Sequence, residues 1–128
     1  SVTSPTDSST SGSAEHERGA LHRLPGMTLI TDWPQGSFVE NLAAKHDGHL
    51  LVTVYSRNEI YEVDPTLSRA NRTLLVTLPA GPTGIVELDF NHFYVNVGVI
   101  GQRNTWSIYR LSVHHGNPAT ASFKHVVD

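Results

Sequence analysis

The chain has 128 residues, with nine Lys and Arg, twelve Asp and Glu, and a formal net charge of −3. This length suffices for one small domain. The sparse, slightly acidic charge argues against a protein that binds nucleic acids or the surface of an anionic membrane. Cysteine is absent, which excludes disulfides and thiolate metal sites, and no apolar run approaches the roughly 20 residues that a membrane-spanning helix needs.

Residues 1–19, "SVTSPTDSSTSGSAEHERG", consist mostly of Ser, Thr, Gly, Pro and acidic residues. Because they offer little apolar surface to bury, we expect a flexible tail. The chain begins at Ser1 rather than Met, and Asn71-Arg72-Thr73 is an N-glycosylation sequon. These two features favour a secreted protein glycosylated at Asn71, with a cytoplasmic protein as the alternative.

The domain, residues 20–128, contains short apolar runs that alternate with polar residues and are separated by turn sequences such as Asp-Gly, Asp-Pro and Gly-Pro. No segment shows convincing helical periodicity, so the pattern predicts an all-β fold. The predicted strands are 27–33, 37–45, 49–56, 59–65, 72–79, 83–90, 92–99, 105–113 and 122–128.

An internal repeat indicates how these strands are organised. "LAAKHDGHLLVT" (42–53) matches "IVELDFNHFYVN" (85–96) at an offset of 43, and "EIYEVD" (59–64) matches "SIYRLS" (107–112) at an offset of 48. The difference places a five-residue insertion between Asn96 and Ser107. Four strands in a period near 43 are typical of a β-propeller blade, and a β-sandwich is the alternative for nine strands.

The repeat predicts blade one at 37–79 and blade two at 81–128, with 27–33 as an extra strand of the kind that closes a propeller ring. Propellers have about 4–8 blades, so two blades leave a sheet face without a neighbour. We therefore expect further blades to come from a second chain or from self-association, with three copies giving six blades as one arrangement.

The segments "GSFVENLAAKHDGHLLVTVYSRNEIYEVDP" and "LPAGPTGIVELDFNHFYVNVG" resemble the start of the six-bladed propellers of the SMP-30/gluconolactonase-like superfamily. The similarity is greatest to a fungal branch whose opening reads "ENLAxxxDGxLLVT…IYxVDP". It extends over roughly residues 36–113 and implies that this chain corresponds to two blades of such a ring.

The resemblance implies two activities. Typical members of the superfamily are metal-dependent lactonases or esterases, and Glu40 matches the first ligand of their single divalent cation, calcium or magnesium. In that pattern Gly-Pro follows the Glu, whereas Asn41-Leu42 follows it here, and the other ligands come from later blades. Some fungal members resemble hetero-Diels–Alderases, which join a hydrophobic polyene to a reactive quinone methide without a required cofactor.

The blade pattern places one group of residues on a common face of the ring. Glu40, Asn41 and Tyr55 are the candidate catalytic residues on this face. Candidate substrate-binding residues are Thr83 and three members of the inserted loop, Arg103, Asn104 and Trp106. Loops on a rigid scaffold commonly carry binding residues, and aromatic side chains can stack on a polyene. Each of these residues also has a purely structural interpretation: it could form hydrogen bonds to neighbouring backbone or cover the core.

The eight histidines show no compact metal-ligand spacing, and His46 and His49 are expected in solvent beside the Asp47-Gly48 turn. The sequence contains no GxSxG elbow and no phosphate-binding glycine motif. Three functions therefore compete: a cyclase that shapes a pocket for a hydrophobic substrate, a metal-dependent lactonase or esterase, and a non-catalytic propeller module that binds proteins. We favour the cyclase because of the resemblance to the fungal branch, the absence of acid–base motifs and the aromatic residues on the common face. Cycloaddition depends on orientation more than on acid–base groups.

Overall fold

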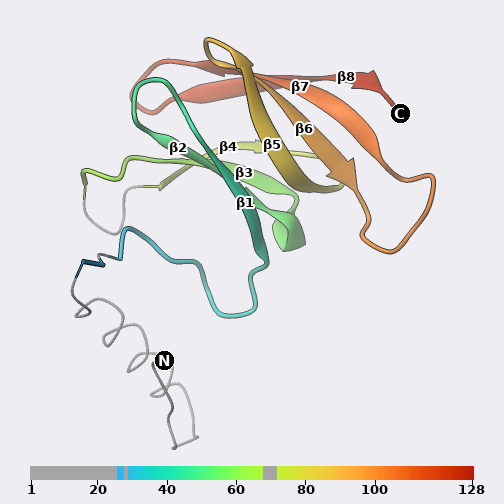
Figure 1. The fold of residues 1–128 in the computed structure, drawn as a ribbon, viewed down its shortest axis with the longest axis horizontal. Coiled ribbons are helices and arrows are strands. Elements are labelled where there is room, and N and C mark those ends of the chain that lie inside the picture. The colour runs from blue at the N-terminus through green and yellow to red at the C-terminus, as the bar shows by residue number, and fades with distance from the viewer. Residues whose placement is uncertain (1–25, 28, 68–71) are drawn as a thin grey trace, which may run out of the picture.

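The computed structural model describes residues 26–27, 29–67 and 72–128, so the predicted tail and Asn71, the acceptor of the sequon, lie outside the described residues. The chain is all-β, with two four-stranded antiparallel sheets (Figure 1). The first sheet contains β1 (Val39–Ala44), β2 (Leu50–Val54), β3 (Glu59–Val63) and β4 (Arg72–Thr77). The second contains β5 (Gly81–Asp89), β6 (His92–Gly98), β7 (Ser107–His114) and β8 (Thr120–Val127). A 3-10 turn, η1 (Tyr55–Arg57), joins β2 to β3.

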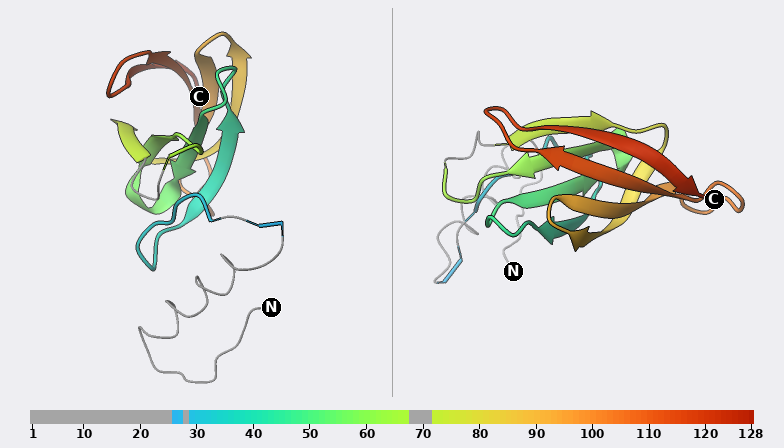
Figure 2. Two further views of the ribbon diagram at one scale, coloured as in Figure 1. Left: turned by 90° about the vertical axis from the view of Figure 1, so that its left-hand side faces the viewer. Right: turned by 90° about the horizontal axis from the view of Figure 1, so that it is seen from above.

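Each sheet is a meander of four consecutive strands, in the order β1-β2-β3-β4 and β5-β6-β7-β8. In a Greek-key sandwich, strands pass from one sheet to the other, whereas here the chain completes one sheet before it starts the next. This connectivity, together with the four-strand repeat, is consistent with two propeller blades. The further views in Figure 2 show the two sheets as separate layers.

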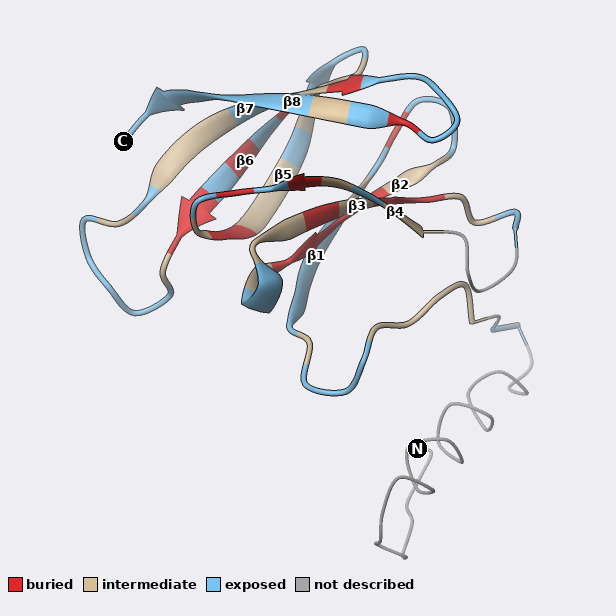
Figure 3. Cartoon of the chain, turned by 180° about the vertical axis from the view of Figure 1, so that it is seen from behind, coloured by how far each residue is buried: buried red, intermediate tan, exposed pale blue. Residues whose placement is uncertain are grey.

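The two sheets pack face to face through one apolar core. Buried residues of both sheets form it, and strand alternation directs them to the shared side. They are Leu51, Ile60 and Val76 from the first sheet, Leu78 just after β4, and Phe93, Val95, Val97, Leu111 and Val113 from the second sheet. In Figure 3 the buried residues on β2, β3 and β6 are red, whereas β8 is mostly exposed and pale blue.

The opposite face of the first sheet is apolar as well. Val52, Val54 and Val63 form a second cluster there, and Ile30 and Trp33 pack against it from the chain before β1. The described residues of 27–33, predicted as an extra strand outside both blades, do lie outside both sheets, but none of them is in a strand. This segment packs against the sheet face through its side chains, so Ile30 and Trp33 are half-buried without strand pairing.

Thr53 on β2 connects the two sheets with its hydroxyl group. The side chain is fully buried, and its Oγ1 donates to the carbonyl oxygen of Thr83 on β5 at 3.1 Å. The same oxygen accepts the N–H of Asn41 at 3.0 Å and lies 3.3 Å from the Asn41 carbonyl. One hydroxyl group therefore fixes the spacing between β1 and β5, the first strand of each sheet, which we call the inner strands.

We expect Thr53→Val to lower the free energy of unfolding by about 1–3 kcal/mol, because it leaves buried backbone groups without their partner. Urea unfolding followed by tryptophan fluorescence measures the change. Thr77→Val, on an exposed position of β4, is the matched control and should change stability by less than about 0.5 kcal/mol. Equal effects of the two substitutions would contradict this role of Thr53.

Candidate functional site

Both inner strands begin with a β-bulge at positions that the repeat makes equivalent. In β1, Val39 pairs with Val54 and Asn41 with Thr53, so Glu40 is the extra residue. In β5 the register shifts between Pro82 and Ile85, a stretch that contains Thr83. Bulges redirect side chains and are common beside active sites. The structure thus places Glu40 and Thr83, two predicted site residues, at the irregular start of an inner strand.

Asn41 lies next to Glu40 and is largely engaged by its neighbours. Its side-chain Oδ1 accepts the N–H of Leu42 at 2.7 Å, and its backbone is held by Thr53. Its amide NH2 group remains available as a hydrogen-bond donor on the exposed side chain. Thr83 is half-buried, and its Oγ1 lies 3.4 Å from the carbonyl oxygen of Asn96.

Tyr55 anchors the inserted loop of the second sheet. Its hydroxyl oxygen accepts the N–H of Ile100 at 2.9 Å, across 45 residues of sequence. The ring packs on Gly81, where an added Cβ would lie 2.2 Å from Tyr55 Cδ1, so only glycine permits this approach. Phe38 meets the same ring edge-on at 5.5 Å between centroids. The predicted catalytic residue Tyr55 therefore has a clear structural role.

The inserted loop, residues 99–106, is held by its own hydrogen bonds. Thr105 Oγ1 accepts the N–H of Val99 at 3.0 Å and donates to the carbonyl oxygen of Gln102 at 3.0 Å. Trp106 lies against Gly98, where an added Cβ would meet the indole ring at 2.5 Å. The loop is therefore a fixed structure that presents exposed groups, among them Arg103.

A hollow of about 580 Å³ adjoins this loop and brings two predicted substrate-binding residues together. Its lining residues are Asn104, Thr105, Trp106, Ser107 and Asp128. Trp106 is 37% exposed, and Ile100 nearby in the loop is 49% exposed. We call the three aromatic residues Phe38, Tyr55 and Trp106, together with the aliphatic Ile100, the aromatic rim. It combines exposed apolar surface with an amide donor from Asn104.

Asp128 bridges two polar side chains at the same hollow. Its Oδ1 lies 2.7 Å from His125 Nε2 and accepts the Ser107 hydroxyl at 2.8 Å. Hydrogen bonds from His125 and then Ser107 lower the pKa of Asp128 below its usual value. The imidazole contacts the carboxylate and not the serine, so this order does not activate a serine nucleophile.

A second hollow, of about 420 Å³, opens on the outer face of the second sheet. Asn41 of β1 reaches its edge, and the remaining lining comes from β5, β6 and β7: Gly84, Ile85, Val86, Tyr94, Asn96 and Ile108. Among these residues Val86 is 60% exposed and Tyr94 36%. The surface is mainly apolar and carries two side-chain amides.

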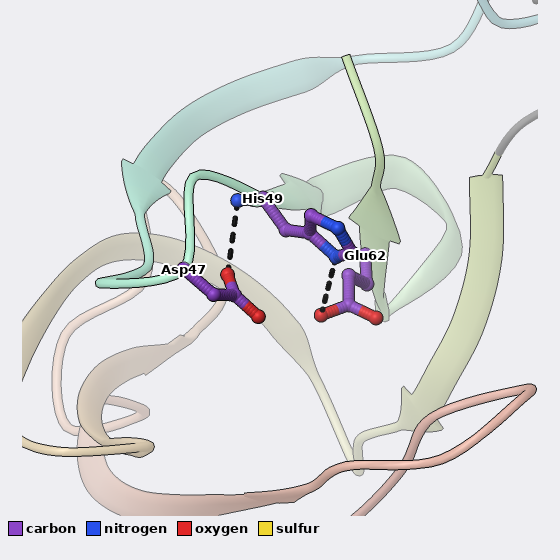
Figure 4. A group of neighbouring side chains, drawn as sticks. All are labelled: Asp47, His49 and Glu62. Atoms are coloured by element: carbon purple, nitrogen blue, oxygen red, sulfur yellow. Dashed lines mark hydrogen bonds and ion pairs between the residues drawn. The ribbon is translucent and has the colours of Figure 1, made fainter. Parts of the chain in front are cut away.

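Glu40, the residue that matches a metal ligand of lactonases, lies exposed at the start of β1. Within the described residues, the side chains close enough to share a metal ion are Asp47, His49 and Glu62, a group without Glu40 (Figure 4). That group surrounds the turn at the other end of β1. Lys45, 5% exposed, is ion-paired there with Glu62 and lies 3.3 Å from Asp47.

The Lys45 ammonium group occupies the centre of this cluster and supplies the positive charge that the carboxylates need. Burial alone would raise the pKa of Asp47, but the His49 N–H and the charge of Lys45 outweigh it and lower this pKa. His49 bridges Glu62 and Asp64, with 3.4 Å from a ring nitrogen to each. The cluster is therefore an ion-pair network that joins β1, β2 and β3.

Of the two histidines beside the turn, His49 is less solvated than the sequence predicted, whereas His46 is exposed as expected. His49 is half-buried among carboxylates, and the His46 ring lies 3.6 Å from the Phe90 ring of the second sheet, centroid to centroid. Sequence reasoning also missed Lys45 and Glu62, which lie 17 residues apart and meet only through strand register. An isolated Lys beside a turn gave no signal of burial.

No protein-family model, no curated protein and no solved structure matches this chain. Within the part of the chain that the structure describes, none of the helices has the length and apolar character needed to cross a membrane.

Replacing Tyr55 by Phe removes the acceptor of the Ile100 amide. We expect that amide to exchange with deuterium roughly two- to tenfold faster, as the loss of one hydrogen bond of about 0.5–1.5 kcal/mol implies. Exchange measured by NMR reports the single amide. Tyr94→Phe, a phenol on another strand, should leave it unchanged, and unaltered protection in Tyr55→Phe would show that the loop holds itself.

Lys45→Met should lower the free energy of unfolding by about 3–5 kcal/mol, because Glu62, 8% exposed, keeps a buried charge that has lost its lysine and retains only the His49 ring beside it. The double variant Lys45→Met/Glu62→Leu should recover most of this loss. Lys124→Met, on exposed β8, serves as the control for removing a lysine. If the double variant is no more stable than Lys45→Met, the ion pair is not the cause.

Proposed function

We propose that this chain forms part of a propeller-type enzyme that binds a hydrophobic polyene and promotes its hetero-Diels–Alder cyclisation with a reactive quinone methide. One observation carries the proposal. The aromatic rim exposes Trp106 and Ile100 on a loop fixed by Tyr55 and Thr105, beside a hollow of about 580 Å³. Preformed hollows of about 300–1,000 Å³ are typical of small-molecule sites.

The reaction matches what these side chains offer. In the cycloaddition, the carbonyl oxygen and the exocyclic carbon of the quinone methide bond to the two carbons of one alkene. All electrons stay within the two reactants, so no proton acceptor or redox partner is required. The protein needs to orient the reactants and to exclude water, which can supply several kcal/mol of the barrier.

Particular residues have tasks in this scheme. Trp106 and Ile100 would bind the polyene by apolar contact, and the indole face is well suited to a conjugated chain. Asn104 and Arg103, both exposed on the same loop, would donate hydrogen bonds to the quinone methide oxygen as it gains negative charge. In a complete propeller ring, Glu40 and Asn41 would lie at the opening of the central channel, where they can orient polar parts of the substrate.

The chain has two tryptophans, Trp33 and Trp106, which allows a direct binding test. In the Trp33→Phe variant all indole emission comes from Trp106, and we expect the conjugated polyene retinol to quench it in a saturable way. In wild-type background, Trp106→Ala should weaken retinol binding roughly tenfold or more, because about 1.5–3 kcal/mol of apolar contact is lost. Leu67→Ala, on an exposed turn, should leave binding unchanged. Linear, non-saturable quenching would contradict a site at the rim.

Turnover separates the cyclase from the metal-dependent lactonase. A terpene polyene incubated with an in-situ quinone methide should give the cycloadduct faster with protein than without it, and a chelator should not change this rate. Product formation followed by chromatography measures both conditions. Lactone hydrolysis that stops on chelation and returns with calcium would favour the hydrolase instead.

A further inference from the structure

The repeat identifies which surface of the second sheet corresponds to the buried surface of the first. Residues of β1 and β2 correspond to those of β5 and β6 at an offset of 43, and β3 to β7 at an offset of 48. The face of the first sheet that packs on the second includes Ala43, Leu51, Thr53 and Ile60. The corresponding residues of the second sheet are Val86, Tyr94, Asn96 and Ile108.

These corresponding residues have opposite environments. Leu51 and Ile60 are fully buried between the sheets, whereas Val86 is 60% and Tyr94 36% exposed. The four residues line the hollow of about 420 Å³, which we call the open face of blade two. The open face therefore repeats the chemistry of an interface that the chain itself already forms, but has no sheet packed against it within the described residues.

The complementary surface is present on the first sheet. Its outer face carries Leu50, Val52, Val54 and Val63, whose counterparts Phe93, Val95, Val97 and Leu111 form the second sheet's half of the core. Leu42 pairs with Val52 on this outer face and is 57% exposed, although its counterpart Ile85 packs against the core between the sheets.

Ile30 and Trp33 cover this outer face only in part. They pack beside Val52, Val54 and Val63 and leave Leu42 exposed. The cover is also imperfect, because Trp33 Nε1 is buried and has no hydrogen-bond partner among the described residues. A buried N–H without a partner is unfavourable, because its lost hydration is not replaced by a hydrogen bond. A sheet face of matching shape would be a better cover than this segment.

We propose that a second copy of this chain docks the outer face of its first sheet onto the open face of blade two. Two different surfaces meet, so the contact is heterologous and each bound copy presents a new open face. Its geometry repeats the packing between the two sheets within one chain, with the incoming sheet replacing the Ile30–Trp33 cover. Closed rings of about two to four copies would contain the 4–8 blades usual for propellers. This proposal stands on the repeat and the exposed faces, independently of the proposed cyclase activity.

The test uses one substitution on each surface. Val86→Asp alters the open face, and Leu42→Asp alters the outer face of the first sheet. Both positions are more than half exposed, so the folded chain should tolerate them, which circular dichroism checks. Light scattering after size exclusion at about 100 μM measures the mass. We expect a wild-type mass that is a multiple of 14.0 kDa and a monomer for each variant.

Mixing the two variants gives the decisive result. The Leu42→Asp chain keeps an intact open face and the Val86→Asp chain keeps an intact outer face, so an equimolar mixture can form one interface and should give a dimer of twice the monomer mass. Leu67→Asp, at an exposed position outside both surfaces, should assemble like wild type. A monomeric wild type, variants that assemble normally, or a mixture that stays monomeric would each overturn the proposal. If the chain is monomeric but still binds retinol, the assembly proposal fails and the proposed function stands.

Discussion

Each sheet of this protein is apolar on both faces, and that constraint determines the rest of the structure. A surface sheet with one polar face needs a single cover, but here Leu51 and Val52 on the same strand point to opposite sides and are both buried. The two sheets pack against each other, which buries one apolar face of each sheet. The first sheet then takes a partial cover from Ile30 and Trp33, while the second exposes Val86 and Tyr94. Sheets with two apolar faces are usual in stacked arrays, where every sheet lies between two neighbours.

The polar contacts that accompany this packing fall into two groups. At one end of the inner strands, Thr53 and Tyr55 connect the sheets through hydrogen bonds to Thr83 and Ile100. At the other end, Lys45 neutralises the carboxylates beside the first turn. The first group fixes the loop that carries the aromatic rim, whereas the second closes the far end. The functional proposal depends on the first group alone.

The sequence predicted the strands and the two-sheet repeat well, because alternation and turn residues are local signals. β1 to β8 lie within or close to the predicted ranges, and the Asp47-Gly48 turn lies between β1 and β2. The segment around Trp33 was harder, since an apolar run that packs by side chains has the same pattern as one that pairs. Lys45 could not be foreseen from the repeat, because Leu88 stands at the equivalent position. A sequence repeat predicts which positions pack in both sheets, but it does not predict ion pairs that form in only one of them.

The hydrogen bond between Tyr55 and Ile100 has a consequence for how such sheets can be rearranged. A loop of one sheet is held by a side chain from the sheet before it, so the two are not interchangeable units. If the second sheet were moved to another place in an array, or duplicated, its long loop would lose the hydrogen bond from Ile100 to Tyr55. Only a preceding sheet with a tyrosine after its second strand, facing a glycine like Gly81, could restore it. Loop length and the residue that supports it must therefore change together in evolution and in design.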